Sequence, residues 1–413
     1  MEKFSTETLS LVCSLLADEE LCQFRLVCKQ FAEVGAKFIG TEMSLRMTND
    51  DLCRLYQISA KPQLYSSLQS LHYAPANLLY PANPCEIPRR YLERLFPGTL
   101  GTLGPNDDML CDDETTFNER EKDQLDVMRR QYDQIVFSVS LPKFEQLQHI
   151  YLYFGEKGQS NDQPHTDGAG TRHLEVILNV ISSIKINSLA LYNLDWDFFY
   201  RKDDAHLRRL FEPIANLERL ELVLHDAHKS QYASGDEADY VRCQNRMHRA
   251  VLRKCLGTLK NLCSLTISCG HPFPLWSAFI TPLSQIVSPG CNWSNLTSLQ
   301  LSSVSCEKQD LIKFFQHHRS LRRLCLGNVI LRNTSWVPVL AEIRKKLNLT
   351  APCICGTIMG RHEKGEKEFY CCKMPALIDV NRYIERGGDA YPDMACPINE
   401  KNASDADTVV VIS

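Results

Sequence analysis

Apolar residues recur at helical spacing near the start of the chain. Between residues 4 and 34 they fall at positions i, i+3, i+4 and i+7, in two successive stripes. The stripes consist of Leu9, Val12, Cys13 and Leu16, followed by Leu21, Phe24, Val27, Cys28, Phe31 and Val34. Ser5 and Asp18 stand before them, where their side chains can cap free backbone N–H groups. The pattern predicts two short amphipathic helices. Leu11, Leu15 and Leu26 lie off the stripes, so part of the apolar surface is expected to face away from any internal core.

A second pattern, L-x-x-L-x-L, recurs between residues 68 and 326. Its last two apolar positions alternate inward on a strand, and the first enters from the preceding turn. The motifs begin at Leu68, Leu147, Ile186, Leu217, Leu262, Leu296 and Leu321. Apolar helical stretches lie between or after them, at 174–184, 207–215, 246–256, 275–287, 311–316 and 337–347. Such alternation predicts an α/β solenoid with parallel strands on one side and helices on the other.

The repeats are irregular. Only the last spacing, from Leu296 to Leu321, falls within the roughly 20–29 residues of a regular leucine-rich repeat. The asparagine that joins successive regular repeats would stand three residues after the last leucine. Those positions hold Gly155, Leu194, His225, Gly270, Val304 and Val329. We therefore expect strand–helix alternation without a regular asparagine ladder.

The segments outside the repeats are read from composition and helix signals. We expect residues 37–45 to lead into a short helix that Thr48 or Asn49 begins and Pro62 ends. A longer helix is predicted over 117–140, and Pro142 ends it. Residues 74–116 are rich in Pro, Gly, Asn and Asp and predict a loop insertion. Two more polar insertions cover 155–172 and 229–240. In repeat proteins such loops leave from one face, which is often the binding face.

Cysteines near the C-terminus raise the question of a metal site. Cys353-x-Cys355 and Cys371-Cys372 flank His362, but paired zinc ligands are usually separated by two or more residues. Alternation instead predicts two strands, 351–355 and 369–372, joined by a charged turn over 362–368. We predict no metal, no cofactor and no catalytic site, because the chain has no nucleophile elbow, phosphate loop or dinucleotide fingerprint. We thus expect a protein that is not an enzyme.

The first 40 residues or so resemble the F-box family. The resemblance is carried by Glu7-x-Leu9, by Glu20-Leu21, and above all by the string R-L-V-C-K-x-F over 25–31. The chain departs from the family at 4–5, where Phe-Ser replaces the usual Leu-Pro. The resemblance implies docking on a Skp-type adaptor of a cullin ubiquitin ligase. The residues assigned to this adaptor surface are Leu9, Val12, Leu16, Leu21, Arg25, Val27, Cys28 and Phe31. The alternative is a helical hairpin that packs on the body of the protein.

The order of segments resembles F-box proteins with degenerate leucine-rich repeats, which are common in filamentous fungi. It implies an F-box over 1–45, a helical connector over 46–140, a leucine-rich-repeat-like solenoid over 141–350, a C-terminal cap over 351–396 and a flexible tail over 397–413. The implied function is that of the substrate-recognition subunit of an SCF-type ubiquitin ligase, whose target the sequence does not name. The alternative is an interaction scaffold without a ligase role, in which the first helices cap the solenoid.

Composition bears on which kinds of partner the protein binds and on the compartment in which it is found. A formal charge of −4 and a pI near 6.3 give no basic footprint for nucleic acid. No run of 18 apolar residues predicts a membrane span, and the N-terminus lacks the layout of a signal peptide. The 18 cysteines then imply a reducing compartment, so we expect a cytoplasmic or nuclear protein without a membrane partner.

The target site is predicted from the strand positions that point away from the helices. These hold tyrosines at the N-terminal end of the array, Tyr151, Tyr153 and Tyr192, and mostly small and polar residues further on. Tyrosine is enriched in binding hot spots. We expect the target to bind near these tyrosines; the alternative is that the 155–172 insertion covers them.

Overall fold

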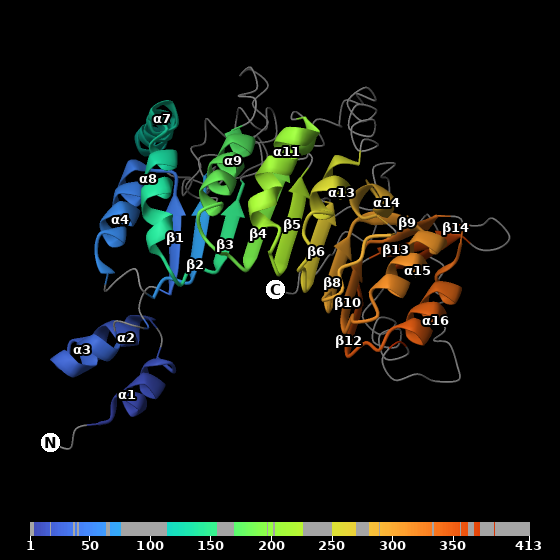
Figure 1. The fold of residues 1–413 in the computed structure, drawn as a ribbon, viewed down its shortest axis with the longest axis horizontal. Coiled ribbons are helices and arrows are strands. Elements are labelled where there is room, and N and C mark those ends of the chain that lie inside the picture. The colour runs from blue at the N-terminus through green and yellow to red at the C-terminus, as the bar shows by residue number, and fades with distance from the viewer. Residues whose placement is uncertain are drawn as a thin grey trace, which may run out of the picture. The chain divides into compact units, whose positions relative to one another are not determined.

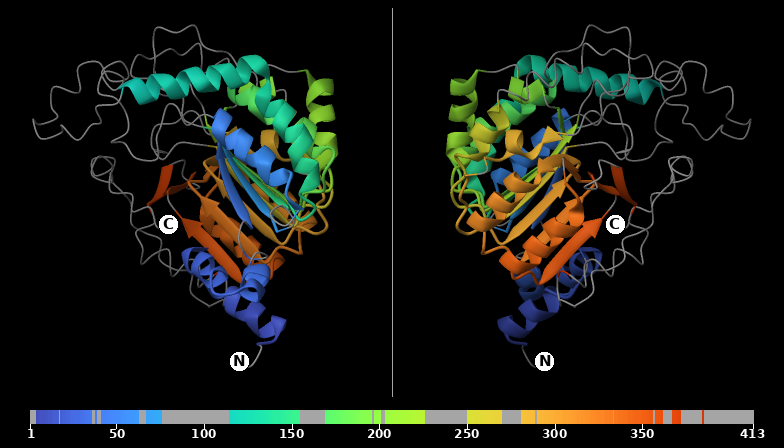
Figure 2. Two further views of the ribbon diagram at one scale, coloured as in Figure 1. Left: turned by 90° about the vertical axis from the view of Figure 1, so that its left-hand side faces the viewer. Right: turned by 90° about the vertical axis from the view of Figure 1, so that its right-hand side faces the viewer.

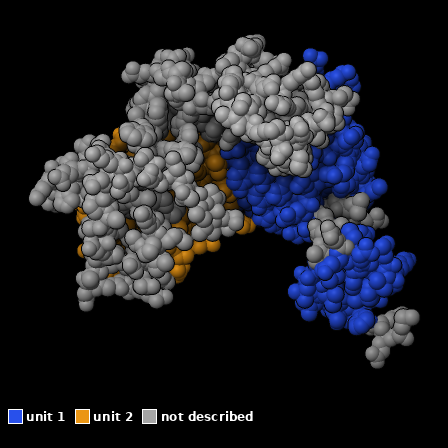
Figure 3. Space-filling view, turned by 180° about the vertical axis from the view of Figure 1, so that it is seen from behind, with its two compact units in different colours: residues 1–194 blue, residues 195–413 orange. Residues whose placement is uncertain are grey.

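The computed structural model describes residues 4–16, 18–35, 38, 41–62, 67–75, 114–154, 169–195, 197–200, 203–225, 250–269, 281–288, 290–332, 334–355, 357–361, 367–371 and 384. Within these ranges nine parallel strands alternate with helices, so the fold is α/β, as the L-x-x-L-x-L pattern predicts. The chain divides into two compact units, residues 1–194 and 195–413, which Figure 3 shows in different colours.

The N-terminal segment forms three helices, α1 (Thr6–Cys13), α2 (Asp18–Arg25) and α3 (Lys29–Gly35), so the prediction of two was wrong. The α1 cap is as expected: the Ser5 side chain accepts a hydrogen bond from the Thr8 N–H. The second stripe is broken at 26–28, because the N–H groups of Leu26 and Val27 bond back only three residues, to Gln23 and Phe24. Such tight bonds end a helix, and α3 then begins in a new direction.

The first unit contains four parallel strands in the order β1 (Glu42–Arg46), β2 (Ser70–Ala74), β3 (His149–Tyr153) and β4 (Ser188–Asp195). Figures 1 and 2 show α4 (Asn49–Ser59), α8 (Tyr132–Ser140) and α9 (Ala169–Ile181) on one face of them. The helix predicted to begin at Thr48 or Asn49 is confirmed as α4, whose N-cap is Thr48, but strand β1 over 42–46 was not predicted. Its backbone is partly closed by α4: Arg46 N–H donates to Asp51, and Arg54 donates to the Ser44 carbonyl. Closed backbone groups discourage pairing with another chain.

The long helix predicted over 117–140 is divided in two. It comprises α7 (Glu114–Arg130) and α8, and a short 3₁₀ turn over Leu141–Lys143 follows. Between them Gln131 has a φ of 53°, a left-handed conformation that an α-helix cannot continue through. The break lets α8 pack its Val136 and Phe137 into the core, where both are buried.

The second unit repeats the strand–helix alternation. Its parallel strands are β5 (Arg219–His225), β6 (Ser264–Cys269), β8 (Ser298–Ser302), β10 (Arg323–Gly327) and β12 (Ala351–Cys355), in that order. The helices are α10 (Asp197–Tyr200), α11 (Asp204–Phe211), α13 (Val251–Leu256), α14 (Leu283–Ile286), α15 (Lys308–His317) and α16 (Trp336–Lys346), with a 3₁₀ turn at Glu212–Ile214. All six strands that the L-x-x-L-x-L motif predicts from residue 147 onward are confirmed.

A second sheet in this unit was not predicted. Its strand order is β14 (Lys367–Cys371), β13 (Thr357–Arg361), β11 (Ile330–Arg332), β9 (Val304–Glu307) and β7 (Thr281–Pro282). The two strands expected around the C-terminal cysteines exist, but they are not partners. Strand β12 pairs with β10, whereas β14 pairs with β13 in the second sheet. Cys353 and Cys355 therefore belong to one sheet and Cys371 to the other.

Backbone hydrogen bonds show a regularity that the sequence hides. In seven repeats among the described residues, the carbonyl of the residue just before the strand accepts two consecutive N–H groups from the next repeat. These carbonyls belong to Thr41, Gln69, Gln148, Glu218, Cys263, Thr297 and Arg322. Where the asparagine ladder would stand, buried Leu194, Val304 and Val329 each follow a residue of positive φ. At these positions the backbone conformation changes at the residue of positive φ, and an apolar side chain is buried immediately after it.

Several predictions fall on parts of the chain that are not described. They are most of the insertions at 74–116 and 155–172, the whole of 229–240, the turn at 362–366, Cys372, and the tail at 397–413.

Candidate interaction surfaces

The three N-terminal helices enclose a core of their own. Leu9, Cys13, Leu21 and Val34 are buried in it, and Leu16, Phe24, Phe31 and Phe38 pack against them. The rings of Phe24 and Phe31 stack with their centroids 4.4 Å apart. The Gln30 side chain donates to the Phe4 carbonyl, which ties the start of the chain to α3. Because these residues form a core, the remaining apolar side chains of the three helices are left on the surface.

That surface carries an unusual number of large apolar side chains. Leu15 and Leu26 are each 79% exposed and Val27 is 66% exposed, and three further residues belong to the set: Phe4, Leu11 and Val12. Single exposed apolar residues are ordinary in soluble proteins, but a concentration of them marks an interaction site. We call these six residues the apolar surface of α1–α3.

The residues predicted for adaptor binding divide between this surface and the core. Val12, Val27 and Cys28 are exposed, whereas Leu16, Arg25 and Phe31 are partly buried. Leu9 and Leu21 are 2% and 1% exposed, so they support the surface from inside. Three further members, Leu11, Leu15 and Leu26, were expected to face away from the core because they lie off the helical stripes, and all three are exposed. Phe4 was not predicted as a member of the surface.

Arg25 occupies a tight position between α2 and α3. A Cβ added to Gly35 would lie 2.6 Å from the Arg25 Cγ, so only glycine lets the two helices approach this closely. The Nε of Arg25 is buried, and no hydrogen-bond partner for it exists among the described residues. Buried polar groups are normally hydrogen-bonded. Arg25 is therefore held by packing, which agrees with a structural role beside the apolar surface.

The strands of the first unit carry a second surface, on the face that alternates with the buried leucines. Strand pairing places His72 on β2 opposite Tyr151 on β3, and Tyr153 on β3 opposite Tyr192 on β4. The His72 and Tyr151 rings stack with centroids 4.3 Å apart and an interplanar angle of 7°. Tyr153 and Tyr192 stack at 4.9 Å and 14°. We call these four residues the aromatic row.

Polar contacts connect the two stacks of the aromatic row. The His72 Nδ1 and the Tyr153 hydroxyl are 3.1 Å apart, within hydrogen-bond distance. The His72 Nε2 lies 3.9 Å from a carboxylate oxygen of Glu42 on β1. The structure thus brings together the three tyrosines predicted for target binding, and adds His72. The motif beginning at Leu68 could have revealed His72, because it occupies the same motif position as Tyr151.

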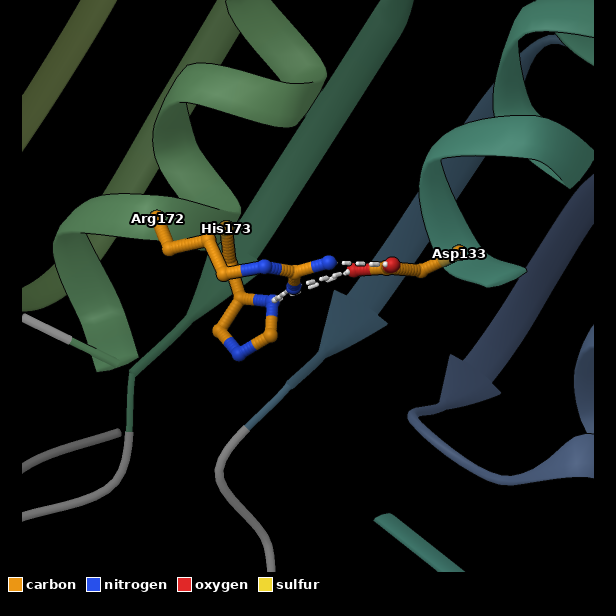
Figure 4. Close-up of polar contacts among 3 residues, drawn as sticks. All are labelled: Asp133, Arg172 and His173. Atoms are coloured by element: carbon orange, nitrogen blue, oxygen red, sulfur yellow. Dashed lines mark hydrogen bonds and ion pairs between the residues drawn. The ribbon is translucent and has the colours of Figure 1, made fainter. Parts of the chain in front are cut away.

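A buried charged cluster lies on the helix side of the same strands (Figure 4). Asp133 on α8 is fully buried, and Arg172 on α9 donates two hydrogen bonds of 2.7 Å to its carboxylate. The His173 Nδ1 lies 3.4 Å from the same carboxylate. Tyr73, next to His72 on β2, packs its ring edge-on to His173. Strand β2 therefore contributes His72 to the aromatic row on one face, and on the other face its Tyr73 packs against the charged cluster.

The electrostatics of this cluster favour a structural role. Burial alone would raise the pKa of Asp133. Hydrogen bonds from His173 and Arg172, together with the charge of Arg172, outweigh burial and hold that pKa far below its ordinary value. Burial lowers the pKa of His173 and raises that of Tyr73. The result is an ionised pair beside a neutral imidazole, which joins α8 to α9.

Neither a metal-binding cluster nor a membrane-spanning helix is seen in the described ranges. There, no three His, Cys, Asp or Glu side chains gather in a way that could hold a metal ion. Nor is any helix among those residues both long and apolar enough to cross a membrane. Comparison with models of known protein families finds no match for the chain, and a search of curated proteins finds none either.

Proposed function

We propose that the chain is the substrate-recognition subunit of an SCF-type cullin ubiquitin ligase, acting in the cytoplasm or nucleus. Residues 1–45 are the F-box that binds a Skp-type adaptor, and the strand–helix repeats hold a target protein. The observation that carries the proposal is the exposure of Leu11, Leu15, Leu26 and Val27 on a small helical unit with its own core. The R-L-V-C-K-x-F string over 25–31 supports the same assignment.

The internal core also bears on the alternative, a cap for the solenoid. A capping hairpin would use its apolar residues to cover the first repeat. Here the buried cluster is built from residues 9–34 and is packed by residues 16–38, which belong to the three helices and their immediate continuation. A self-contained unit with apolar residues left over supports docking on another protein.

The proposed mechanism is proximity. The adaptor and cullin bring an activated ubiquitin, and the receptor holds the target beside it, so that target lysines meet ubiquitin at high effective concentration. The aromatic row supports the target-holding role, because aromatic side chains are enriched in binding hot spots. No chemistry is required of the chain itself.

Adaptor binding is tested with Val27→Lys. In the free protein the lysine stays in water, because Val27 is 66% exposed. In the complex it would be an unpaired buried charge, which costs several kcal/mol. We expect pull-down of a purified Skp-type adaptor to be abolished, with the circular dichroism spectrum unchanged. Gln57→Lys, an exposed α4 position outside the three helices, is the matched control and should bind normally.

Leu15→Lys repeats the test at a second exposed position. If both variants remain folded and capture the adaptor as well as the wild type, the F-box assignment is wrong. A chain that binds the adaptor but never brings cullin or a ubiquitinated client with it would be a scaffold and not a ligase subunit.

A further inference from the structure

Two cysteines lie side by side on neighbouring strands of the second unit. The parallel pairing of β10 with β12 places Cys325 opposite Cys353. Leu324, Leu326 and Ile354 on the same strands are buried, so alternation directs both thiols to the other face, where both residues are partly exposed. The pair is therefore within reach of small solutes.

Strand geometry decides what such a pair can do. Paired strands lie about 4.7–4.9 Å apart, and a disulfide joins Cα atoms separated by about 4.4–6.8 Å, most often near 5.5–6 Å. A disulfide between the two cysteines is therefore possible, although the separation of their Cα atoms falls in the lower part of the range that disulfides bridge. Exposed disulfides are more easily reduced than buried ones, and both of these residues are partly exposed, as is typical of reversible sites.

We propose that Cys325 and Cys353 form a peroxide-sensitive dithiol that closes reversibly to a disulfide. One thiolate attacks an oxygen of hydrogen peroxide, which gives a sulfenic acid and, after protonation of the leaving hydroxide, a molecule of water. The second thiolate attacks the sulfenyl sulfur and forms the S–S bond. The departing hydroxide takes up a proton and becomes a second water. Two thiols lose two electrons in total, and one peroxide gains them.

The consequence concerns the last parallel strand of this unit. Strand β12 ends the order of parallel strands in the described residues, and it begins with two N–H groups, of Thr350 and Ala351, bonded to the Arg322 carbonyl. The disulfide would add a covalent link from β12 to β10. Oxidation would therefore hold β12 more firmly on the sheet. This inference does not depend on the ubiquitin-ligase proposal.

The test uses the full chain, reduced and diluted to suppress links between molecules. After treatment with hydrogen peroxide and blocking of free thiols, a non-reducing digest is analysed by mass spectrometry. We expect a peptide in which Cys325 is linked to Cys353, and its loss after dithiothreitol. Cys325→Ser and Cys353→Ser should lack it, whereas the matched control Cys263→Ser, also partly exposed in this unit, should keep it.

Hydrogen exchange gives a second readout. Exchange in β12 should slow on oxidation of the wild type and of Cys263→Ser, and should not change in the other two variants. The proposal is overturned if exposed Cys53 becomes oxidised while no link between Cys325 and Cys353 forms. A link from either residue to a different cysteine would overturn it as well.

Discussion

The two compact units distribute apolar and charged side chains in opposite ways. Among the described residues, every exposed large apolar side chain belongs to the first unit: Phe4, Leu11, Val12, Leu15, Leu26, Val27, Tyr56, Leu125, Ile135, Val139 and Tyr153. The first unit also buries the ionised Asp133. The outward strand positions of the second unit hold mainly small or polar residues, such as Thr266, Ser268, Gln300 and Ser302. Its buried titratable side chain other than cysteine is His318, held in a neutral form.

The difference shows where this chain departs from the rule of apolar inside and polar outside. Both departures are unfavourable in isolation, because exposed apolar area and buried charge each cost free energy. A partner can offset the first, and an ion pair offsets the second. We propose that the first unit contributes most of the contacts with other proteins and that the second unit is stabilised mainly by apolar packing.

The largest expected effect tests the buried charge of the first unit. Arg172→Met removes both hydrogen bonds to Asp133 and leaves a buried carboxylate without its cation. Breaking such a pair typically costs about 3–5 kcal/mol. We expect a loss of that size in the free energy of urea unfolding, measured by circular dichroism.

Two further variants make this result specific. Arg129→Met, at an exposed α7 position, should change stability by less than about 0.5 kcal/mol. The double variant Asp133→Asn, Arg172→Met should recover part of the loss, because it no longer buries a charge. Equal stability of Arg172→Met and the wild type would show that the cluster does not hold α8 on α9.

How far the sequence predicts these features depends on whether their cause is local. The L-x-x-L-x-L motif found the strands from residue 147 onward because burial on one face repeats every second residue. The same motif placed Tyr151, Tyr153 and Tyr192 on a common face. It missed β1, where Met43 and Leu45 supply the alternation without the leading leucine. The partner of β1 lies beyond Pro62, and local periodicity does not report such pairing.

The unpredicted parts depend on contacts between distant segments. Asp133 reads as a polar position on an amphipathic helix, and only the arrival of Arg172, 39 residues later, makes its burial favourable. Strands β7, β9 and β11 have only two to four residues each, too few for alternation to be recognised. Leu11 and Leu15 were noticed as surplus apolar residues, but only the folded core shows that they remain exposed.

The second expected effect tests the aromatic row as the target site. Once a client has been captured, Tyr151→Ala and Tyr192→Ala should each weaken its binding by more than about 1 kcal/mol, because each removes a large stacked ring from the contact area. Calorimetric titration measures this loss, and adaptor pull-down should be unaffected.

The control for this prediction comes from the other unit. Gln300→Ala changes an equivalent outward strand position in the second unit, where no aromatic residue stands at this position of the motif, and should leave client affinity unchanged. If Gln300→Ala weakens binding and both tyrosine variants do not, the target site belongs to the second unit. Target binding must then be assigned to the second unit and not to the first.

The smallest expected effect concerns the neutral histidine in the core of the second unit. The backbone N–H of Trp293 donates a hydrogen bond of 3.1 Å to the Nε2 of His318. The Nδ1 of the same ring lies 2.7 Å from the Phe314 carbonyl oxygen. Burial lowers the pKa of His318 below its ordinary value near 6.5. The unfolded chain therefore binds a proton at a higher pH than the folded one. Linkage then requires stability to fall as the pH drops through about 6.5 and below.

Substitution at two adjacent histidines isolates this contribution. His318→Gln keeps an acceptor for Trp293 and removes the titrating group, whereas His317→Gln changes an exposed neighbour. Hydrogen exchange of peptides covering α15 and β10 should accelerate between pH 7.5 and 5.5, after correction for intrinsic rates, in the wild type and in His317→Gln. His318→Gln should be less stable at pH 7.5 but should show a shallower dependence on pH. If the pH dependence of His318→Gln equals that of the wild type, protonation of His318 does not cause the loss of stability at low pH. A different titrating group must then be responsible.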